Sequence, residues 1–229
     1  MNKPSISQMP LIQKLEAVVD EHSALSNWHD YGILSQTREI FLGPDDDGLD
    51  GKDAVTFIKN LVMLESLSSD PVIIHQYNVG GDQNAGLAIY DAIIASKCKF
   101  LFICYGSASS MGSIIPQAVF GKGIRATHAN CEWVIHEGSC ESSGTTKQFI
   151  SNAEALKRSK NAMYDIYTKC CKKGIAFKGK KPEEIKSILK RRLNVKEDWI
   201  LSGEQAVEYG LADVLIRGKN SVEALLKKI

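Results

Sequence analysis

A serine-bearing turn joins a segment expected to be a strand to one expected to be a helix. Residues 106–113, with the sequence Gly-Ser-Ala-Ser-Ser-Met-Gly-Ser, follow the apolar run 100–105 and precede the apolar run 114–120. A hydroxyl at such a junction lies beside unpaired backbone N–H groups and the positive end of the helix dipole. Those groups can hold the oxyanion that forms when a serine attacks an acyl carbon, so the segment indicates a serine hydrolase. The structural alternative is a serine that only caps the helix.

The order and types of these residues exclude one familiar class. The nucleophile elbow of α/β-hydrolases requires Gly-x-Ser-x-Gly, with the acid before the histidine in the chain. Position 108 is Ala, so that pattern is not present.

The general base that such a serine needs is best matched by His136. It ends the apolar segment 131–136, and open α/β sheets place their chemistry at the C-terminal ends of strands. The other four histidines fit less well. His22 belongs to a solvent-facing amphipathic helix, His29 to a connector over 27–32, His75 to the middle of a buried strand and His128 to a turn.

Bulk composition excludes several function classes. The 229 residues suffice for one large domain with a proper core, and 44% are hydrophobic and 24% charged. Lys and Arg total 28 against 27 Asp and Glu, which gives no whole-chain footprint for nucleic acid or anionic lipid. The lysine-rich stretch 172–192 is expected to be a solvated face. The acidic run 45–47 lacks the calcium-loop spacing, and Leu87 stands where a P-loop needs Lys, so we expect no cofactor.

Cysteine usage and the N-terminus favour a cytoplasmic location. The six cysteines form no Cys-x-x-Cys pair and no disulfide framework, which suits a reducing compartment; they stand at positions 98, 104, 131, 140, 170 and 171. The first residues lack the features of a signal or transit peptide, and no run approaches the roughly 18 apolar residues that cross a membrane.

Hydrophobic periodicity predicts alternating strands and helices. Strands are expected over 38–42, 72–77, 99–105, 124–127, 131–136 and 214–216. Helices are expected over 10–25, 52–67, 84–96, 110–121 and 145–172, with a polar loop at 174–181, a helix that opens at Pro182, a capping box at 202–205 and a polar helical tail. This alternation predicts an α/β fold with a largely parallel sheet covered on both faces.

The motifs together resemble the Clp protease proteolytic subunit family. The similar segments are the Gly-Gly turn and helix at 78–95, Ala-Ser-Ser-Met-Gly-Ser at 108–113, Val-Ile-His at 134–136, Asp-Trp-Ile-Leu-Ser at 198–202 and Ala-Val-Glu-Tyr-Gly-Leu-Ala-Asp at 206–213. They occur in the family's order, and the likeness runs from about Tyr31 to Ile216.

The resemblance implies roles for individual residues. Ser110 would be the nucleophile, His136 the general base and Asp198 the group that orients the imidazole. From the residues alone, three other carboxylates compete with Asp198 for that role: Asp213, Asp82 and Asp165. The oxyanion hole would use the backbone N–H groups of Met111 and of Gly80 or Gly81, with Gly81 preferred. Glu137, Gly138 and Ser139 would contact substrate.

The resemblance also implies an architecture. We expect a crotonase-like fold with repeated β-β-α and βα units and a projecting handle built from the loop 137–144 and the start of the helix 145–172. Heptameric rings would stack as a tetradecamer, receive unfolded chains from a ring-shaped ATPase and pair substrate with the handle by strand addition. The expected divisions are an N-terminal helical segment at 1–28, a peptidase domain at 29–217 and a C-terminal tail at 218–229.

Departures from the family pattern indicate a divergent member. Residues 1–28 do not resemble the family's N-terminus, and the segment 174–195 is longer than usual. Val79 replaces a proline, and Glu137-Gly138 replaces Gln-Pro, which puts a carboxylate next to the presumed base. Two alternatives remain: a catalytically latent paralogue within such a ring, and a crotonase-fold acyl-CoA enzyme.

Overall fold

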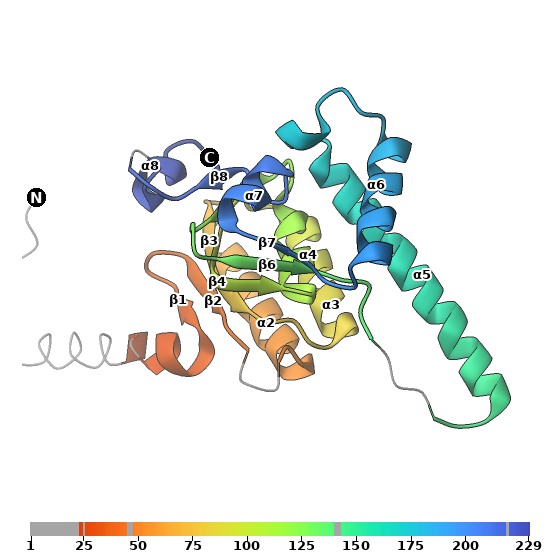
Figure 1. Ribbon diagram of the computed structural model, residues 1–229. Coiled ribbons are helices and arrows are strands. Elements are labelled where there is room, and N and C mark those ends of the chain that lie inside the picture. Colours follow the sequence, from red (N-terminus) through yellow and green to blue (C-terminus); the bar gives the residue numbers. More distant parts are fainter. Residues whose placement is uncertain (1–22, 25, 45–47, 140–142, 219) are drawn as a thin grey trace, which may run out of the picture.

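The computed structural model describes residues 23–24, 26–44, 48–139, 143–218 and 220–229, and it is built around one sheet of eight strands (Figure 1). The strand order is β1-β2-β3-β4-β5-β8, and β6 and β7 extend the sheet beside the end of β4. The strands are β1 (Ile33–Leu34), β2 (Glu39–Leu42), β3 (Val72–Asn78), β4 (Phe100–Ser109), β5 (Gly123–Thr127), β6 (Glu132–Ile135), β7 (Trp199–Leu201) and β8 (Val214–Leu215).

The sheet is largely parallel, as expected from the sequence. The pairs β2/β3, β3/β4, β4/β5, β4/β6 and β5/β8 are parallel, whereas β1/β2 and β6/β7 are antiparallel. The ten-residue β4 serves two neighbours in turn: Phe100–Cys104 pair with β5, and Ser107–Ser109 pair with β6. The end of β4 is therefore enclosed between β3 and β6.

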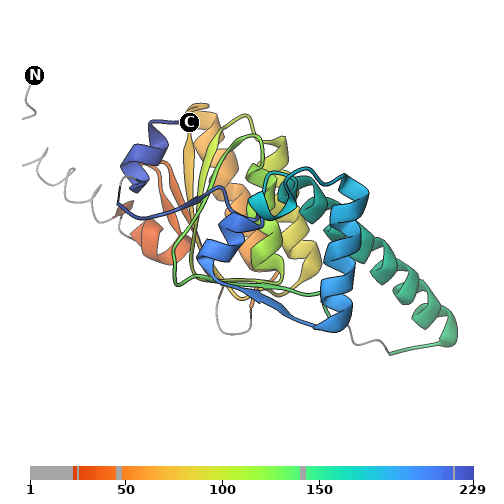
Figure 2. The same cartoon turned by 45° about the horizontal axis from the view of Figure 1, so that its top comes forward.

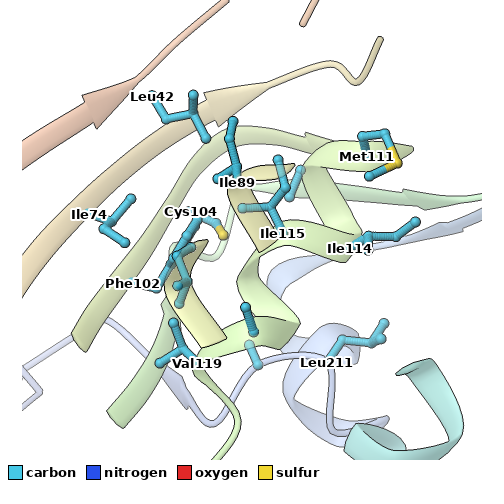
Figure 3. Close-up of a cluster of buried hydrophobic side chains, with 14 of the residues drawn as sticks. Leu42, Ile74, Ile89, Phe102, Cys104, Met111, Ile114, Ile115, Val119 and Leu211 are labelled. Atoms are coloured by element: carbon cyan, nitrogen blue, oxygen red, sulfur yellow. The ribbon is translucent and has the colours of Figure 1, made fainter. Parts of the chain in front are cut away.

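Helices bury one face of this sheet. They are α2 (Gly51–Leu67), α3 (Gln83–Ala95), α4 (Met111–Ile114) and the 3₁₀ helix η2 (Ile115–Val119). Their apolar residues pack with alternate strand residues such as Ile74 and Phe102 in one continuous core (Figure 3). Alternation in the strands sends Ile73, Leu101 and Ile103 to the opposite face, where α8 (Val222–Leu226) covers them with Leu225.

A long helix projects from this body. The helix α5 (Thr146–Cys171) begins at a capping box formed by Thr145 and Gln148, and its N-terminal part extends beyond the sheet in both views (Figures 1 and 2). Its C-terminal part is buried through Met163, Tyr164 and Tyr167 and lies beside α6 (Pro182–Val195). The chain then passes through α7 (Gly203–Glu208) to β8.

Most sequence predictions of elements are confirmed, with four corrections. The connector expected over 27–32 is helical through residue 31, so His29 lies on a helix. The helix expected over 110–121 divides into α4 and η2, because Pro116 cannot donate a backbone hydrogen bond. The loop 174–181 contains the 3₁₀ helix η3 (Ile175–Phe177), and β1 and β7 were not expected at all.

Other predictions fall partly or wholly outside the described residues. They are most of the helix 10–25, His22, the acidic run 45–47 and Cys140. The five cysteines within the described residues are buried and unpaired. No helix in the described part of the chain is long and apolar enough to span a membrane.

Candidate active site

The backbone turns sharply at Ser110, where β4 ends and α4 begins. Ser110 has φ 52° and ψ −123°, a conformation that is costly for a residue with a side chain and that is held here by surrounding structure. Its N–H donates to the carbonyl of Val134 in β6 (2.8 Å), and its carbonyl accepts from the Ser113 hydroxyl (2.7 Å). The Ser110 side chain makes no capping hydrogen bond. Its hydroxyl is therefore free for another task.

Strand register brings His136 and Asp198 together. In the antiparallel pair β6/β7, Ile135 lies opposite Trp199, so the next residue outward on each strand meets the other. The His136 Nδ1 lies 3.5 Å from the Asp198 Oδ1, and the two side chains are 30% and 54% exposed. The His136 Nε2 is buried and has no hydrogen-bond partner in the described structure. Nδ1 thus lies near the Asp198 carboxylate without a hydrogen bond to it, and Nε2 has no partner among the described residues.

The three competing carboxylates are engaged elsewhere. Asp213 binds the buried Arg125 through both carboxylate oxygens. Asp82 caps α3 by accepting from the Ala85 N–H, and Asp165 pairs with a lysine of α6. Among the carboxylates that the structure describes, Asp198 alone forms an ion pair with His136.

Gly80 and Gly81 form a turn that brings the backbone close to Ser110. Both have positive φ, 101° and 142°, and a Cβ on Gly80 would lie only 2.5 Å from the Ser110 Cβ. The Gly80 N–H is already bonded to the Asn78 side chain at 2.8 Å. The Gly81 N–H has no bond to any described residue, and the Met111 N–H is at the unpaired start of α4.

A cavity of about 510 Å³ joins these groups. Ser110, Met111, Gly81 and His136 line it, together with the loop residues Glu137, Gly138 and Ser139 that the resemblance assigns to substrate contact. Gly80 and Asp198 do not line this cavity; Gly80 packs behind Ser110, and Asp198 lies behind the imidazole.

The helix α5 supplies a wall of the cavity that sequence reasoning did not identify. Leu156, Ser159, Lys160 and Met163 line the cavity from one face of α5. Their spacing of three or four residues is the signal that could have found them, because such residues share a helix face. The wall formed by α5 is therefore mixed, with Leu156 and Met163 apolar and Ser159 and Lys160 polar.

The Glu137 carboxylate is held by α5. Its Oε1 accepts from the Tyr164 hydroxyl, and its Oε2 pairs with the Lys160 ammonium. Burial works to raise the pKa of Glu137, but these two contacts outweigh burial and lower that pKa below its ordinary value. Burial and the Glu137 hydrogen bond in turn raise the pKa of Tyr164 well above its ordinary range.

No cluster of His, Cys, Asp and Glu suited to a metal ion occurs within the ranges that the structure describes. What the site does contain is a strained serine beside free backbone N–H groups, and a histidine backed by a carboxylate. This is the set of groups that serine hydrolases use for acyl transfer. Here Ser110 and His136 directly follow the C-terminal ends of the parallel strands β4 and β6, and Asp198 directly precedes β7.

Comparison with known proteins shows the family. A model of the Clp protease family matches residues 22–219. The ATP-dependent Clp protease proteolytic subunit of Deinococcus radiodurans is 31% identical over 187 residues, which are 81% of this chain and 83% of that protein. The ATP-dependent Clp protease proteolytic subunit 3 of Synechococcus sp. (strain CC9605) is 31% identical over 201 residues, which are 86% and 92% of the two chains. The chain belongs to the Clp protease family, as a divergent member.

Proposed function

We propose that this protein is a serine endopeptidase subunit of a self-compartmentalising, Clp-type protease that cleaves unfolded polypeptides. The observation that carries the proposal is the arrangement around the cavity. Ser110 and His136 line the same cavity, the His136 Nε2 is buried without a hydrogen-bond partner among the described residues, and the Asp198 carboxylate lies 3.5 Å from Nδ1.

The geometry supports a specific division of labour. His136, neutral and with Nδ1–H directed to Asp198, presents Nε2 as a base to Ser110. Ser110 Oγ attacks the scissile carbonyl while its proton moves to Nε2, and the same proton then passes to the leaving amine. The tetrahedral oxyanion accepts hydrogen bonds from the N–H groups of Met111 and Gly81, since the Gly80 N–H already donates to the Asn78 side chain. A water molecule then attacks the acyl-enzyme with the same proton transfers through His136. The acyl group leaves as a carboxylic acid, and Ser110 is regenerated.

Two contacts of this mechanism are not formed as hydrogen bonds in the described conformation. The His136 Nδ1 lies 3.5 Å from the Asp198 Oδ1 without a hydrogen bond. No hydrogen bond joins Ser110 to His136, and Nε2 has no other partner there. Catalytic hydrogen bonds are often long before substrate binds and tighten in the complex. The same gaps favour a second candidate, a latent subunit whose serine is activated only in its assembly.

The family membership extends the proposal to assembly. Ring oligomers would enclose the cavity and work with a ring-shaped ATPase partner, and we include heptameric rings paired as a tetradecamer in this proposal. We assign ring stacking to the projecting part of α5, where the side chains of Phe149 and Ile150 are exposed. Gly138 and Ser139, at the cavity's rim, would pair with extended substrate. A cytoplasmic location belongs to the same proposal.

A fluorophosphonate probe tests the central assignment. Wild-type assembled protein should be labelled and should hydrolyse unfolded peptides, and Ser110→Ala should lose both properties without losing its particle mass. Ser109→Ala is the matched control, because Ser109 is the neighbouring serine and, among the described residues, its hydroxyl bonds to Ser107 alone (2.8 Å). Labelling that survives in Ser110→Ala would refute the assignment. An assembled wild type that resists both probe and peptide would support the latent subunit.

A further inference from the structure

A carboxylate close to a histidine that acts as a general base would raise the pKa of that histidine unless its charge is compensated. Glu137 directly follows His136 and lines the same cavity, and a free carboxylate near an imidazole stabilises the imidazolium, which cannot act as a base. Asp198 already supplies the one carboxylate that orients the ring. A second free negative charge would hold the base protonated at pH values where the neutral form is needed.

The structure shows which groups neutralise the Glu137 carboxylate. Both oxygens of its carboxylate are engaged by α5, one by the Tyr164 hydroxyl and one by the Lys160 ammonium. These two residues are four positions apart and share a helix face. Tyr164 is fully buried, so its hydroxyl is fixed, and the Glu137 side chain is only 26% exposed. The Lys160 side chain is 40% exposed, so the buried Tyr164 hydroxyl is the more firmly fixed of the two partners.

We propose that Lys160 and Tyr164 are positioning residues, which neutralise and hold the Glu137 carboxylate so that His136 keeps Asp198 as its single anionic partner. This inference rests on the proposed role of His136 as the general base. It assigns to α5 a part in the chemistry beyond forming a cavity wall. It also explains how the chain tolerates Glu at the position after the histidine.

The other charged groups around the histidine leave this assignment in place. Asp198 faces the ring from the β7 side, and Asp82 at the start of α3 lines the cavity while its carboxylate caps that helix. From α6, the Lys190 ammonium lies 5.6 Å from the centre of the Tyr164 ring and adds positive charge near Glu137. Lys157 of α5 is exposed and lines a small cavity of about 260 Å³ beside Glu137, without an ion pair among the described residues.

Variants that remove the charge of Lys160, the charge of Glu137 or both charges test the proposal. In Lys160→Met the uncompensated Glu137 favours the imidazolium, so the acidic limb of the kcat/KM profile should move up by about 0.5–1 pH unit. At a pH below the wild-type midpoint this is about a three- to tenfold loss of activity. Tyr164→Phe should move the limb in the same direction by less, because Lys160 remains. Glu137→Gln should move it downward, since a lysine is then left without its carboxylate.

Two variants separate the charge effect from packing. In Glu137→Gln combined with Lys160→Met, both charges are gone, and the limb should return to its wild-type position. Lys157→Met removes the same charge from the preceding turn of α5 and should leave the limb unmoved. A limb that stays in place in Lys160→Met, or an equal shift in Lys157→Met, would overturn the proposal. So would a double variant that remains shifted.

A second readout distinguishes failure of this inference from failure of the proposed function. The pH dependence of diethyl pyrocarbonate modification of His136, followed by mass spectrometry, reports its protonation without any turnover. It is measured on assembled protein in a Ser110→Ala background. Lys160→Met should raise the midpoint of modification by the same 0.5–1 pH unit. If the midpoint shifts there while the assembled protein with Ser110 intact does not hydrolyse peptides, the charge arrangement is supported and the peptidase function is contradicted. Unchanged midpoints, with hydrolysis by the protein that retains Ser110, would do the reverse.

Discussion

Gly80→Ala is the sharpest test of how the Gly-Gly turn supports the serine. The added Cβ would lie 2.5 Å from the Ser110 Cβ and 3.0 Å from the Ser109 carbonyl oxygen. Ordinary contact begins at 3.4 Å, so the Ser110 Cβ must retreat by about 0.9 Å or the turn must open. Neither change is easy, because Ser110 is fixed by its hydrogen bond to Val134 and Gly80 by its bond to Asn78.

The expected cost has two parts. A side chain at the Gly80 φ of 101° costs roughly 1–2 kcal/mol, and overpacking against Ser110 adds about 1–3 kcal/mol. Gly121→Ala is the matched control, because Gly121 also has a positive φ, 83°, but a Cβ there meets nothing within 4 Å. That variant should lose only the conformational part, roughly 1–2 kcal/mol.

Activity should respond more steeply than stability. A displacement of about 1 Å at a reacting atom costs on the order of 10²-fold in rate. We therefore expect fluorophosphonate labelling of Gly80→Ala to slow by about that factor at a temperature where the variant remains folded and assembled, while Gly121→Ala labels at the wild-type rate. Free energies of unfolding come from chemical denaturation. Equal destabilisation of the two variants, with unchanged labelling of Gly80→Ala, would refute the argument that Gly80 abuts the nucleophile.

Three further predictions follow from the same contacts. Asp198→Asn should lower kcat/KM, yet by less than the roughly 10⁴-fold loss seen for a buried triad aspartate, because Asp198 is half exposed; a full 10⁴-fold loss would contradict this. Asp213→Asn removes the anionic partner of the buried Arg125 and should lower the free energy of unfolding in urea by about 3 kcal/mol. A variant that unfolds at the same urea concentration as the wild type would show that this ion pair does not stabilise the fold. Replacing residues 143–150 with a short Gly/Ser linker should yield smaller particles by light scattering, and unchanged mass would argue against stacking through this segment.

The sequence predicted the strands of the sheet better than the geometry of the site. Long apolar runs such as 72–77 and 99–105 predicted their strands correctly, because a parallel strand that is buried on both faces has a nearly continuous apolar sequence. The three-residue β7 escaped prediction: it is an edge strand, and its middle residue, Ile200, is exposed. That is why Asp198 could be singled out only by family resemblance. Its position opposite His136 depends on a strand pairing more than 60 residues apart in sequence, which no local pattern records.

The contacts of Glu137 show a second limit of sequence reasoning. Its place beside the presumed base was visible in the sequence, but its partners lie more than 20 residues further along, on α5. A lysine and a tyrosine four residues apart on a long helix are ordinary helical residues until the fold places them against a carboxylate. The charge of Glu137 was therefore predictable, and its neutralisation was not.

Strand pairing explains which parts of the site are fixed and which part must move. Ser110 directly follows β4, His136 directly follows β6, which pairs with the end of β4, and Asp198 directly precedes β7, which pairs with β6. A slip of one residue in either pairing would turn side chains to the opposite face, so the register is strongly specified. In the proposed mechanism, the hydrogen bond between Ser110 and His136 would therefore form by rotation of side chains or by movement of the segment after β6, and not by a change in the sheet. Because Lys160 and Tyr164 of α5 hold Glu137, a movement of this segment would have to carry α5 with it or break these two contacts.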